Sequence, residues 1–316
     1  MDDNLKLEAE AFDSQIQERV RNGHIPDLRY TVACDYFYNN VWRRPAYVKL
    51  DFGEIFELIR SSINANVSSD TQAKVLEVGC GPGFISLELA RAGYNVLGLD
   101  LSPQCIEVAR NFADKDPHKH ERGSLTYRAA DLFAIEDREF DAVVFVGALH
   151  HFPDQDKVMT RITTLLKPGG IIIAHEPTRD RVTKRNAAFV DFVKVLLSVQ
   201  NGYFETIPVP ANRKAMEELT EKTFKKMRYE LESGEKAQSV NDNEAGFTEM
   251  YGALKKHFSQ IEFKNRYAFF HEMIGGLRFD EKKNVELAAY LKEVDAAFCD
   301  LGILNPAEFY FVGKKS

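Results

Sequence analysis

The sequence has no long hydrophobic run and no excess of basic residues. Its longest apolar stretch, Ala142 to Leu149, is far too short to cross a bilayer. Its 41 lysines and arginines against 48 acidic residues give a formal net charge of −7, which offers no basic surface for nucleic acid. Met1 to Glu10 lack the basic and apolar regions of a signal peptide. These absences argue against membrane, nucleic-acid-binding and secreted proteins and predict a cytoplasmic protein.

Cysteine is also scarce, and the few cysteines are scattered. None forms a CxxC pair, and no histidine pair lies near one with the spacing of a zinc site. We therefore expect reduced thiols and no structural zinc at Cys34, Cys80, Cys105 and Cys299. The composition, 44% hydrophobic and 28% charged, is typical of a folded globular chain.

Residues 1–70 are predicted to be mainly helical. Leu5 to Val20 and Phe52 to Ile63 carry apolar residues at helical spacing. An aromatic cluster lies between them, which fits a lid over a ligand and packing against a domain equally well. Its members are Tyr30, Tyr36, Phe37, Tyr38, Trp42 and Tyr47.

From Lys74 onward, short apolar strands alternate with helices, a pattern that predicts a parallel sheet in a doubly wound α/β fold. The predicted strands are Val75–Val78, Asn95–Leu99, Leu125–Arg128, Ala142–Val146 and Gly170–Ala174. The predicted helices between them are Ile85–Arg91, Pro103–Phe112 and Asp156–Leu166.

The rest of the chain adds helices and two more strands. Further helices are predicted at Val182–Ser198, Lys214–Leu231 and Asn284–Cys299, a polar loop at Ser233–Glu244, and strands at Ile261–Phe270 and Phe309–Val312. We therefore divide the chain into an N-terminal helical extension, 1–70, an α/β core, 71–200 with 250–316, and a helical cap insertion, 201–249.

A glycine loop follows the first predicted strand and runs from Glu77 to Gly83. Such a turn brings backbone N–H groups close to a ligand, so its glycines are expected to serve contact rather than packing. The dinucleotide pattern GxGxxG fails because Phe84 stands where its third glycine would be, and no Lys-Ser or Lys-Thr pair completes a P-loop. The remaining pattern, acid-x-GxGxG, suits a ligand that carries an ammonium group.

With this loop, the chain resembles the class I S-adenosylmethionine-dependent methyltransferases of the small-molecule branch over about residues 70–180. The resemblance implies a seven-stranded, mostly parallel Rossmann-like sheet in which an antiparallel strand, Phe309–Val312, lies beside Ile261–Phe270. It also implies that the loop binds the methionine part of the cofactor through Glu77, Gly79, Cys80, Gly81 and Gly83.

Two further acids follow the loop at the expected places. Asp100 ends the second strand about 20 residues on, where a carboxylate accepts both ribose hydroxyls, although an acid at a helix start would look alike. The resemblance implies that Leu101 lines the adenine pocket, that Asp131 binds the adenine amine and that the Leu132 N–H binds the ring. A surface-loop aspartate is the alternative for Asp131.

The resemblance places the segment from Val146 to Asp154 beside the transferable methyl group, and we expect Val146 to contact the cofactor. His151, or else His150, is the candidate base that takes a proton from the acceptor. Packing or helix capping is the alternative for this pair. Glu176, next to His175 at the end of the fifth strand, would orient an amine or a histidine, or cap a helix. No spacing of acids and histidines indicates a metal site.

The sequence therefore predicts a methyltransferase that moves a methyl group from S-adenosylmethionine to an oxygen or nitrogen of a small metabolite and releases S-adenosylhomocysteine. The alternatives are a protein that binds this cofactor without methyl transfer and a nicotinamide-dependent oxidoreductase. The N-terminal helices and 201–249 are expected to select the acceptor, although Lys214–Leu231 would also suit a dimer surface. A monomer or homodimer, without nucleic-acid or membrane partners, is expected.

Overall fold

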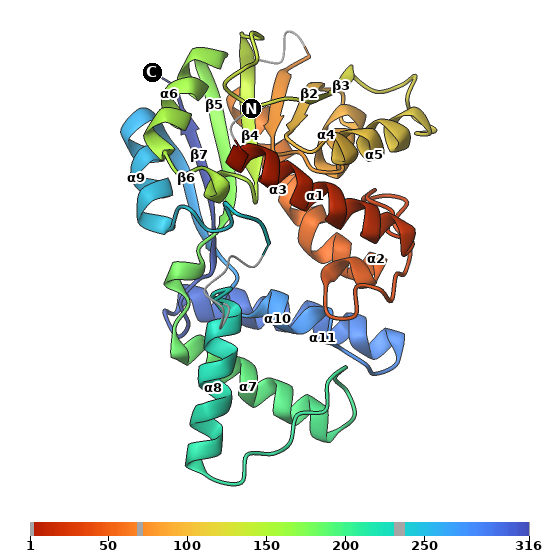
Figure 1. The fold of residues 1–316 in the computed structure, drawn as a ribbon, viewed down its shortest axis with the longest axis vertical. Helices are drawn as coiled ribbons and strands as arrows, with labels where there is room; N and C mark the ends of the chain where they lie inside the picture. Colours follow the sequence, from red (N-terminus) through yellow and green to blue (C-terminus); the bar gives the residue numbers. More distant parts are fainter. Residues whose placement is uncertain (1–2, 68–71, 231–237, 316) are drawn as a thin grey trace.

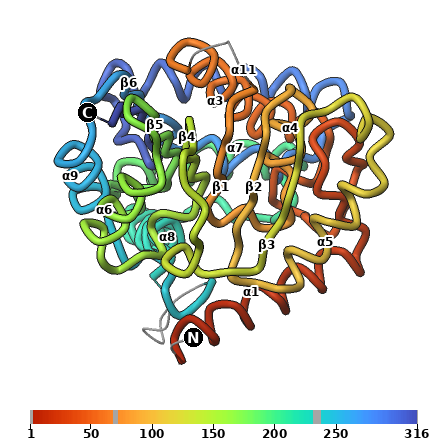
Figure 2. Tube along the Cα trace, turned by 90° about the horizontal axis from the view of Figure 1, so that it is seen from above, coloured from red at the N-terminus to blue at the C-terminus, as the bar shows by residue number. Residues whose placement is uncertain are grey.

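The computed structural model describes residues 3–67, 72–230 and 238–315. Its centre is one seven-stranded sheet in the order β3-β2-β1-β4-β5-β7-β6 (Figures 1 and 2). Neighbouring strands from β3 to β5 are parallel, and β7 runs antiparallel between β5 and β6. The strands are β1 (Lys74–Val78), β2 (Asn95–Asp100), β3 (Leu125–Ala129), β4 (Phe140–Val146), β5 (Leu166–Pro177), β6 (Ser259–Arg266) and β7 (Glu308–Lys314). The predicted doubly wound sheet with its antiparallel strand is confirmed.

Helices cover both faces of the sheet and extend below it. Those before and within the sheet are α1 (Asp3–Arg21), α2 (Pro45–Val48), α3 (Glu54–Asn66), α4 (Phe84–Arg91), α5 (Pro103–Asp114) and α6 (Gln155–Leu165). Those that follow are α7 (Lys184–Val199), α8 (Arg213–Met227), α9 (Phe247–His257), α10 (Phe270–Ile274) and α11 (Glu281–Asp300). Short helical turns are η1 (Val41–Arg43), η2 (Lys49–Gly53), η3 (Leu149–His151) and η4 (Arg179–Arg181).

Alternation along the strands builds a separate core on each face. On β4, Val144 packs into the cluster made with α3 and α4, whereas Val143 and Phe145 pack into the cluster made with α6 and α9. All three side chains are fully buried, as expected for a central strand covered on both faces. Because the sheet is covered on both faces, its carboxyl edge is where loops are free to meet a ligand.

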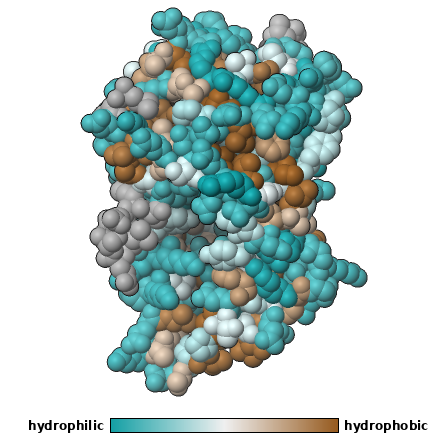
Figure 3. Space-filling model, turned by 45° about the vertical axis from the view of Figure 1, so that its right-hand side comes forward, coloured by the Kyte–Doolittle hydropathy of each residue, from teal (hydrophilic) through white to brown (hydrophobic). Residues whose placement is uncertain are grey.

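A third hydrophobic cluster joins the N-terminal segment to the helices below the sheet, α7, α8, α10 and α11, which form the lower part of the molecule in Figure 1. Phe37, Trp42 and Tyr47 are buried in this cluster, while Tyr30 and Tyr38 are exposed. The packing interpretation therefore holds for the buried members of the aromatic cluster. Figure 3 shows a mostly hydrophilic face, narrowed at mid-height between the sheet and the lower helices.

Several predicted boundaries were wrong. The sixth strand ends at Arg266, because Tyr267 takes a positive φ of 43° and the buried residues from Phe270 onward form α10 instead. The helix α9 was missed within its mixed polar sequence. In α8, Met216 is exposed, since the helix packs mainly on α7 through Thr223 and Met227. Leu231 lies outside the described residues.

Among the described helices, none is both long and apolar enough to span a membrane.

Candidate active site

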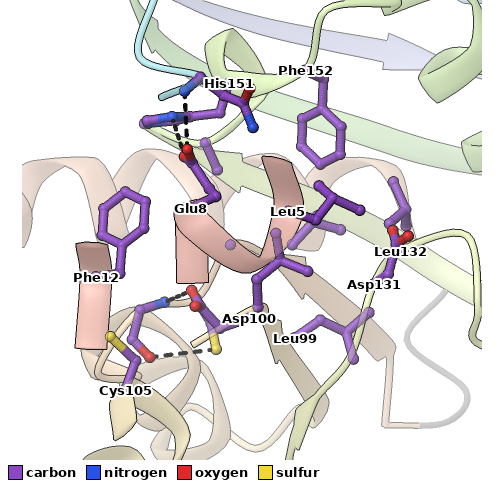
Figure 4. A pocket seen from close by; sticks show the side chains of 18 of the residues that line it. Leu5, Glu8, Phe12, Leu99, Asp100, Cys105, Asp131, Leu132, His151 and Phe152 are labelled. Carbon is purple, nitrogen blue, oxygen red and sulfur yellow. Dashed lines mark hydrogen bonds and ion pairs between the residues drawn. The ribbon is translucent and has the colours of Figure 1, made fainter. Parts of the chain in front are cut away.

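A cavity of about 670 Å³ lies at the carboxyl edge of β1, β2 and β4. Its volume is in the usual range for small-molecule sites. Figure 4 shows Leu5, Glu8 and Phe12 of α1 on one side of it and Asp100, Asp131 and Leu132 on the other. Helix α1 therefore forms one wall of the cavity, and its part in selecting the acceptor stays a prediction.

The glycines of the loop have different tasks. Gly81 lines the cavity with φ +51°, and a Cβ there would meet nothing within 4 Å, so its backbone faces open space. Gly79 also lines the cavity, but a Cβ would meet the Ala148 Cβ at 2.4 Å. Gly83 does not line it, and a Cβ would strike the Tyr127 hydroxyl at 2.5 Å. The expectation that all three glycines serve contact was therefore wrong for Gly83, which is required by packing and by its φ of +81°.

Glu77 lies at the base of the loop and lines the cavity although it is only 3% exposed. Its Oε2 accepts a hydrogen bond from the Ser86 hydroxyl on α4. Burial raises its pKa to about 8, because this hydrogen bond does not offset the loss of solvent. A cation that bound beside Glu77 would supply the missing stabilisation of its charged form.

Asp100 joins the loop to the end of β2. Its Oδ2 accepts a hydrogen bond from the Gly81 N–H at 2.7 Å, and its Oδ1 accepts one from the Ser102 N–H at 2.8 Å. Burial raises its pKa in spite of these bonds. Each carboxylate oxygen keeps a further lone pair, so the side chain is held in place with acceptor capacity left for a diol in the cavity.

The remaining predicted cofactor contacts converge on the same cavity, which Cys80, Leu101, Asp131, Leu132 and Val146 all line. Asp131 Oδ1 accepts a hydrogen bond from the Phe133 N–H at 3.0 Å, which fixes the turn after β3. Their roles toward a ligand stay predictions.

His151 lines the cavity from η3, directly after β4. Its Nδ1 lies 2.9 Å from Glu8 Oε1, and its ring packs edge-on against Phe12. A carboxylate at this distance requires the proton on Nδ1, which leaves Nε2 as the acceptor atom of a neutral ring.

His150 does not line the cavity, and 3% of the residue is exposed. Its Nδ1 lies 2.8 Å from Glu176 Oε2, and its Nε2 has no hydrogen-bond partner among the described residues. Burial lowers the pKa of this imidazole even though Glu176 raises it. Glu176 also accepts hydrogen bonds from the Ala148 and Leu149 N–H groups at 3.0 and 2.9 Å. The two alternatives for Glu176 therefore hold together: it orients a histidine and caps η3.

One group among the described residues has the donor atoms of a metal site. Ligand-type atoms of His150, His151 and Asp242 lie within 4.8 Å of one another. Arg179 Nη1 donates to Asp242 Oδ1 at 3.1 Å, so a cationic side chain already neutralises this carboxylate. The absence of a metal stays a prediction, and this group is where a divalent ion would contradict it.

His175 begins a second, separate network, in which His175 and Asp51 are buried and His271 is partly exposed. Its Nε2 lies 3.1 Å from Glu308 Oε2, Glu308 Oε1 lies 2.7 Å from His271 Nδ1, and His271 Nε2 lies 3.0 Å from Asp51 Oδ1. The two carboxylates hold the pKa of His271 well above its usual value despite burial. This network ties β5 and β7 to the N-terminal segment and α10.

The site also contains residues that the sequence analysis missed. Glu8, Phe12 and Asn241 line the cavity, and Asp242 and Arg179 lie behind His150. Only Glu8 left a signal: it stands among Leu5, Phe12 and Ile16 on one face of a helix, where an apolar residue is expected. Phe12 lies on the same face of that helix, whereas Arg179, Asn241 and Asp242 come from segments without a pattern.

The cavity fits the cofactor expected from the resemblance. The Gly81 backbone faces open space and α4 starts without a side-chain cap. Within the part of the chain that the structure describes, the buried Glu77 has no cationic partner. An open helix N-terminus suits a carboxylate, and Glu77 suits an ammonium group, so an amino-acid moiety is matched at both ends. Asp100 then lies beside the loop to meet a ribose.

Comparison with known proteins agrees with this geometry. Residues 76–174 match the family described as a methyltransferase domain. A ubiquinone biosynthesis O-methyltransferase of Xanthomonas axonopodis pv. citri (strain 306) is 40% identical over 102 residues, 31% of this chain and 40% of that protein. One of Ralstonia nicotianae (strain ATCC BAA-1114 / GMI1000) is 42% identical over 101 residues, 31% of this chain and 40% of that protein. The match thus spans about two fifths of these relatives.

A solved structure extends the likeness in fold to nearly the whole chain. It is that of a proposed sarcosine dimethylglycine methyltransferase from Galdieria sulphuraria, with a TM-score of 0.52 and 14% identity, covering 96% of this chain and 98% of that one. The segment that matches the family, residues 76–174, contains the glycine loop, Asp100, Asp131 and both histidines. Helix α1 and the lower helices lie outside it. Residues 76–174 therefore match a methyltransferase domain, and the fold in which they lie is shared over nearly the whole chain.

Proposed function

We propose that the protein transfers a methyl group from S-adenosylmethionine to an oxygen or nitrogen of a small metabolite and releases S-adenosylhomocysteine. The observation that carries this proposal is that His151 lines the same cavity as the glycine loop and Asp100. A general base and a cofactor site in one enclosed space are what methyl transfer to a hydroxyl or amine requires.

The bound cofactor supplies a methyl group on a positively charged sulfur with a good leaving group. In this proposal the loop at Gly79 and Gly81, Glu77 and Asp100 hold it in place. His151 Nε2 would take the proton that the acceptor loses when it is methylated. Helix α1 excludes water from the cavity.

The structure favours His151 over His150 as the proposed base. His151 lines the cavity, whereas the His150 ring is buried behind it with Nδ1 held by Glu176. In this proposal His150 and Glu176 act indirectly, by holding η3 and therefore the backbone of His151 in place.

The experiment is to incubate the protein with S-adenosylmethionine and a panel of phenols, amines and sugars, and to measure S-adenosylhomocysteine by mass spectrometry. Formation with at least one acceptor, lost in His151→Ala, supports the proposal. Cofactor binding with no product from any acceptor favours the alternative of a protein that binds without methyl transfer. Calorimetric binding of NADH but not of S-adenosylmethionine would favour an oxidoreductase.

A further inference from the structure

Helix α1 carries an acid in the middle of its inward face. Leu5, Glu8, Phe12 and Ile16 follow one another at helical spacing, and all line the cavity. The Glu8 side chain is buried, with 3% of the residue exposed. A carboxylate is costly in such a place unless hydrogen bonds stabilise its charge, so its partners indicate what it does there.

Glu8 is bound by groups from two distant parts of the chain. His151 Nδ1 lies 2.9 Å from Oε1, the Ser239 hydroxyl donates to Oε1 at 2.8 Å, and the Asn241 N–H donates to Oε2 at 3.0 Å. Although burial raises its pKa, these three donors together hold it below the usual value. Glu8 is therefore ionised at neutral pH, and its carboxylate lies beside Nδ1 of His151.

Resting on the proposed function, we propose that Glu8 is the positioning residue of His151: it fixes the Nδ1–H tautomer so that Nε2 accepts the acceptor's proton. The arrangement is that of a carboxylate behind a catalytic imidazole, which orients the ring and stabilises the imidazolium that forms. The proton moves from the acceptor to Nε2 as the methyl group is transferred, and solvent later removes it. Glu8 itself stays ionised throughout.

Because Glu8 lies on α1, the base is complete only when this helix lies over the cavity. Asp13, one turn further along α1, holds the helix independently, since its Oδ1 accepts hydrogen bonds from the Ser102 hydroxyl and the Gln104 N–H at the start of α5. Closing the cavity and orienting the base are therefore one event. In this arrangement Glu8 orients His151 only when α1 also excludes water from the cavity.

The test compares five variants, and one of them, Glu8→Asp, serves as a partial rescue. Glu8→Gln keeps an acceptor oxygen but removes the charge, and Glu8→Leu removes both. Glu10→Gln is the matched control, since Glu10 is exposed on the same helix and pairs with Lys6 at 3.9 Å. Asp13→Ala loosens α1 without touching His151. For each variant we would measure kcat, the Kd of S-adenosylmethionine and the ¹⁵N chemical shifts of His151.

We expect kcat to fall about 10-fold in Glu8→Gln and about 100-fold in Glu8→Leu, with the cofactor Kd within about 3-fold of the parent. Glu10→Gln stays at the parent rate. Asp13→Ala raises the Kd more than it lowers kcat, because kcat is measured with the cofactor bound and α1 closed, where Glu8 still meets His151. Glu8→Asp should recover part of the rate that Glu8→Gln loses.

An unchanged kcat in both Glu8 variants overturns the proposal. So does a fall in kcat that Asp13→Ala reproduces, because Glu8 would then serve closure alone. The ¹⁵N shifts do not depend on turnover: loss of the Nδ1–H tautomer in Glu8→Leu supports the proposal, and its retention contradicts it. If the parent protein methylates no acceptor, the proposed function fails while this spectroscopic result still decides the part of Glu8. Should Glu8→Leu not fold, Glu8→Gln and Glu8→Asp carry the test.

Discussion

The two sides of the cavity are built differently. On the cofactor side, the contacts are close in sequence. Gly81 donates to Asp100 across only 19 residues, and all the expected contacts fall between Glu77 and Val146. On the side of His151, Glu8 meets Asn241 across 233 residues and Ser239 across 231. A site built from one contiguous segment leaves a motif, whereas a site assembled by tertiary packing leaves none.

The largest effect should follow from changing the side assembled from distant segments. In His151→Ala, kcat should fall about 100-fold or more, because general-base catalysis contributes at least that much. The Kd of the cofactor should change little, since the residue meets the acceptor's proton and not the cofactor. Steady-state kinetics with an acceptor found in the panel, together with calorimetry, would separate the two quantities.

His150→Ala is the comparison for this prediction. It should lower kcat less, because His150 does not line the cavity and acts through η3. Full activity in both variants would contradict a histidine base and leave alignment as the protein's contribution. If kcat fell more in His150→Ala than in His151→Ala, His150 would be the base and His151 would act indirectly.

The next effect concerns the cofactor side. Asp100→Ala should weaken S-adenosylmethionine binding about 10- to 100-fold, because hydrogen bonds to a charged group contribute about 1.5–3 kcal/mol each. The variant also leaves the Gly81 and Ser102 N–H groups without their acceptor. Calorimetric titration measures the loss, and circular dichroism checks the fold. An unchanged Kd would refute the assignment of Asp100 to the ribose.

The contrast explains how much could be predicted from the sequence. The alternating strands and helices and the loop at Gly79 and Gly81 followed from local patterns. The resemblance added Asp131, and its convergence with Asp100 was expected because parallel strands bring their carboxyl ends to one edge. Glu8 and Asp242 could not be assigned, since their partners are set by how α1 and residues 238–246 pack on the sheet. The same cause explains the end of β6 at Arg266: tertiary burial of Phe270 overrode a strand-like pattern.

A smaller effect should appear in the number of protons that the protein releases when S-adenosylmethionine binds. Burial raises the pKa of Glu77 to about 8, so at pH 7 this carboxyl is mostly protonated before a ligand binds. An ammonium group beside it favours the ionised form and lowers this pKa, so binding at pH 7 should release about one proton. The release should disappear as the pH rises through 8, where the free protein is already ionised.

This release is measured by titrating S-adenosylmethionine calorimetrically in two buffers of different ionisation enthalpy. Glu77→Gln is the control and should release no proton. Equal proton release in the parent and in Glu77→Gln would show that Glu77 does not meet the ammonium group. The cofactor side would then be held by its backbone and Asp100 alone.

The smallest effect should come from removing metal ions. His150, His151 and Asp242 form the one group that could hold a divalent ion among residues 3–67, 72–230 and 238–315. Arg179 already neutralises Asp242, and the Nδ1–H of each histidine faces a carboxylate at hydrogen-bond distance. Dialysis against a chelator should therefore change the rate less than about twofold, with under about one ion per ten chains by elemental analysis. A stoichiometric ion whose loss abolishes turnover would instead indicate that the two histidines are metal ligands. His151 would then not be the base, because an imidazole nitrogen bound to a metal cannot accept the acceptor's proton.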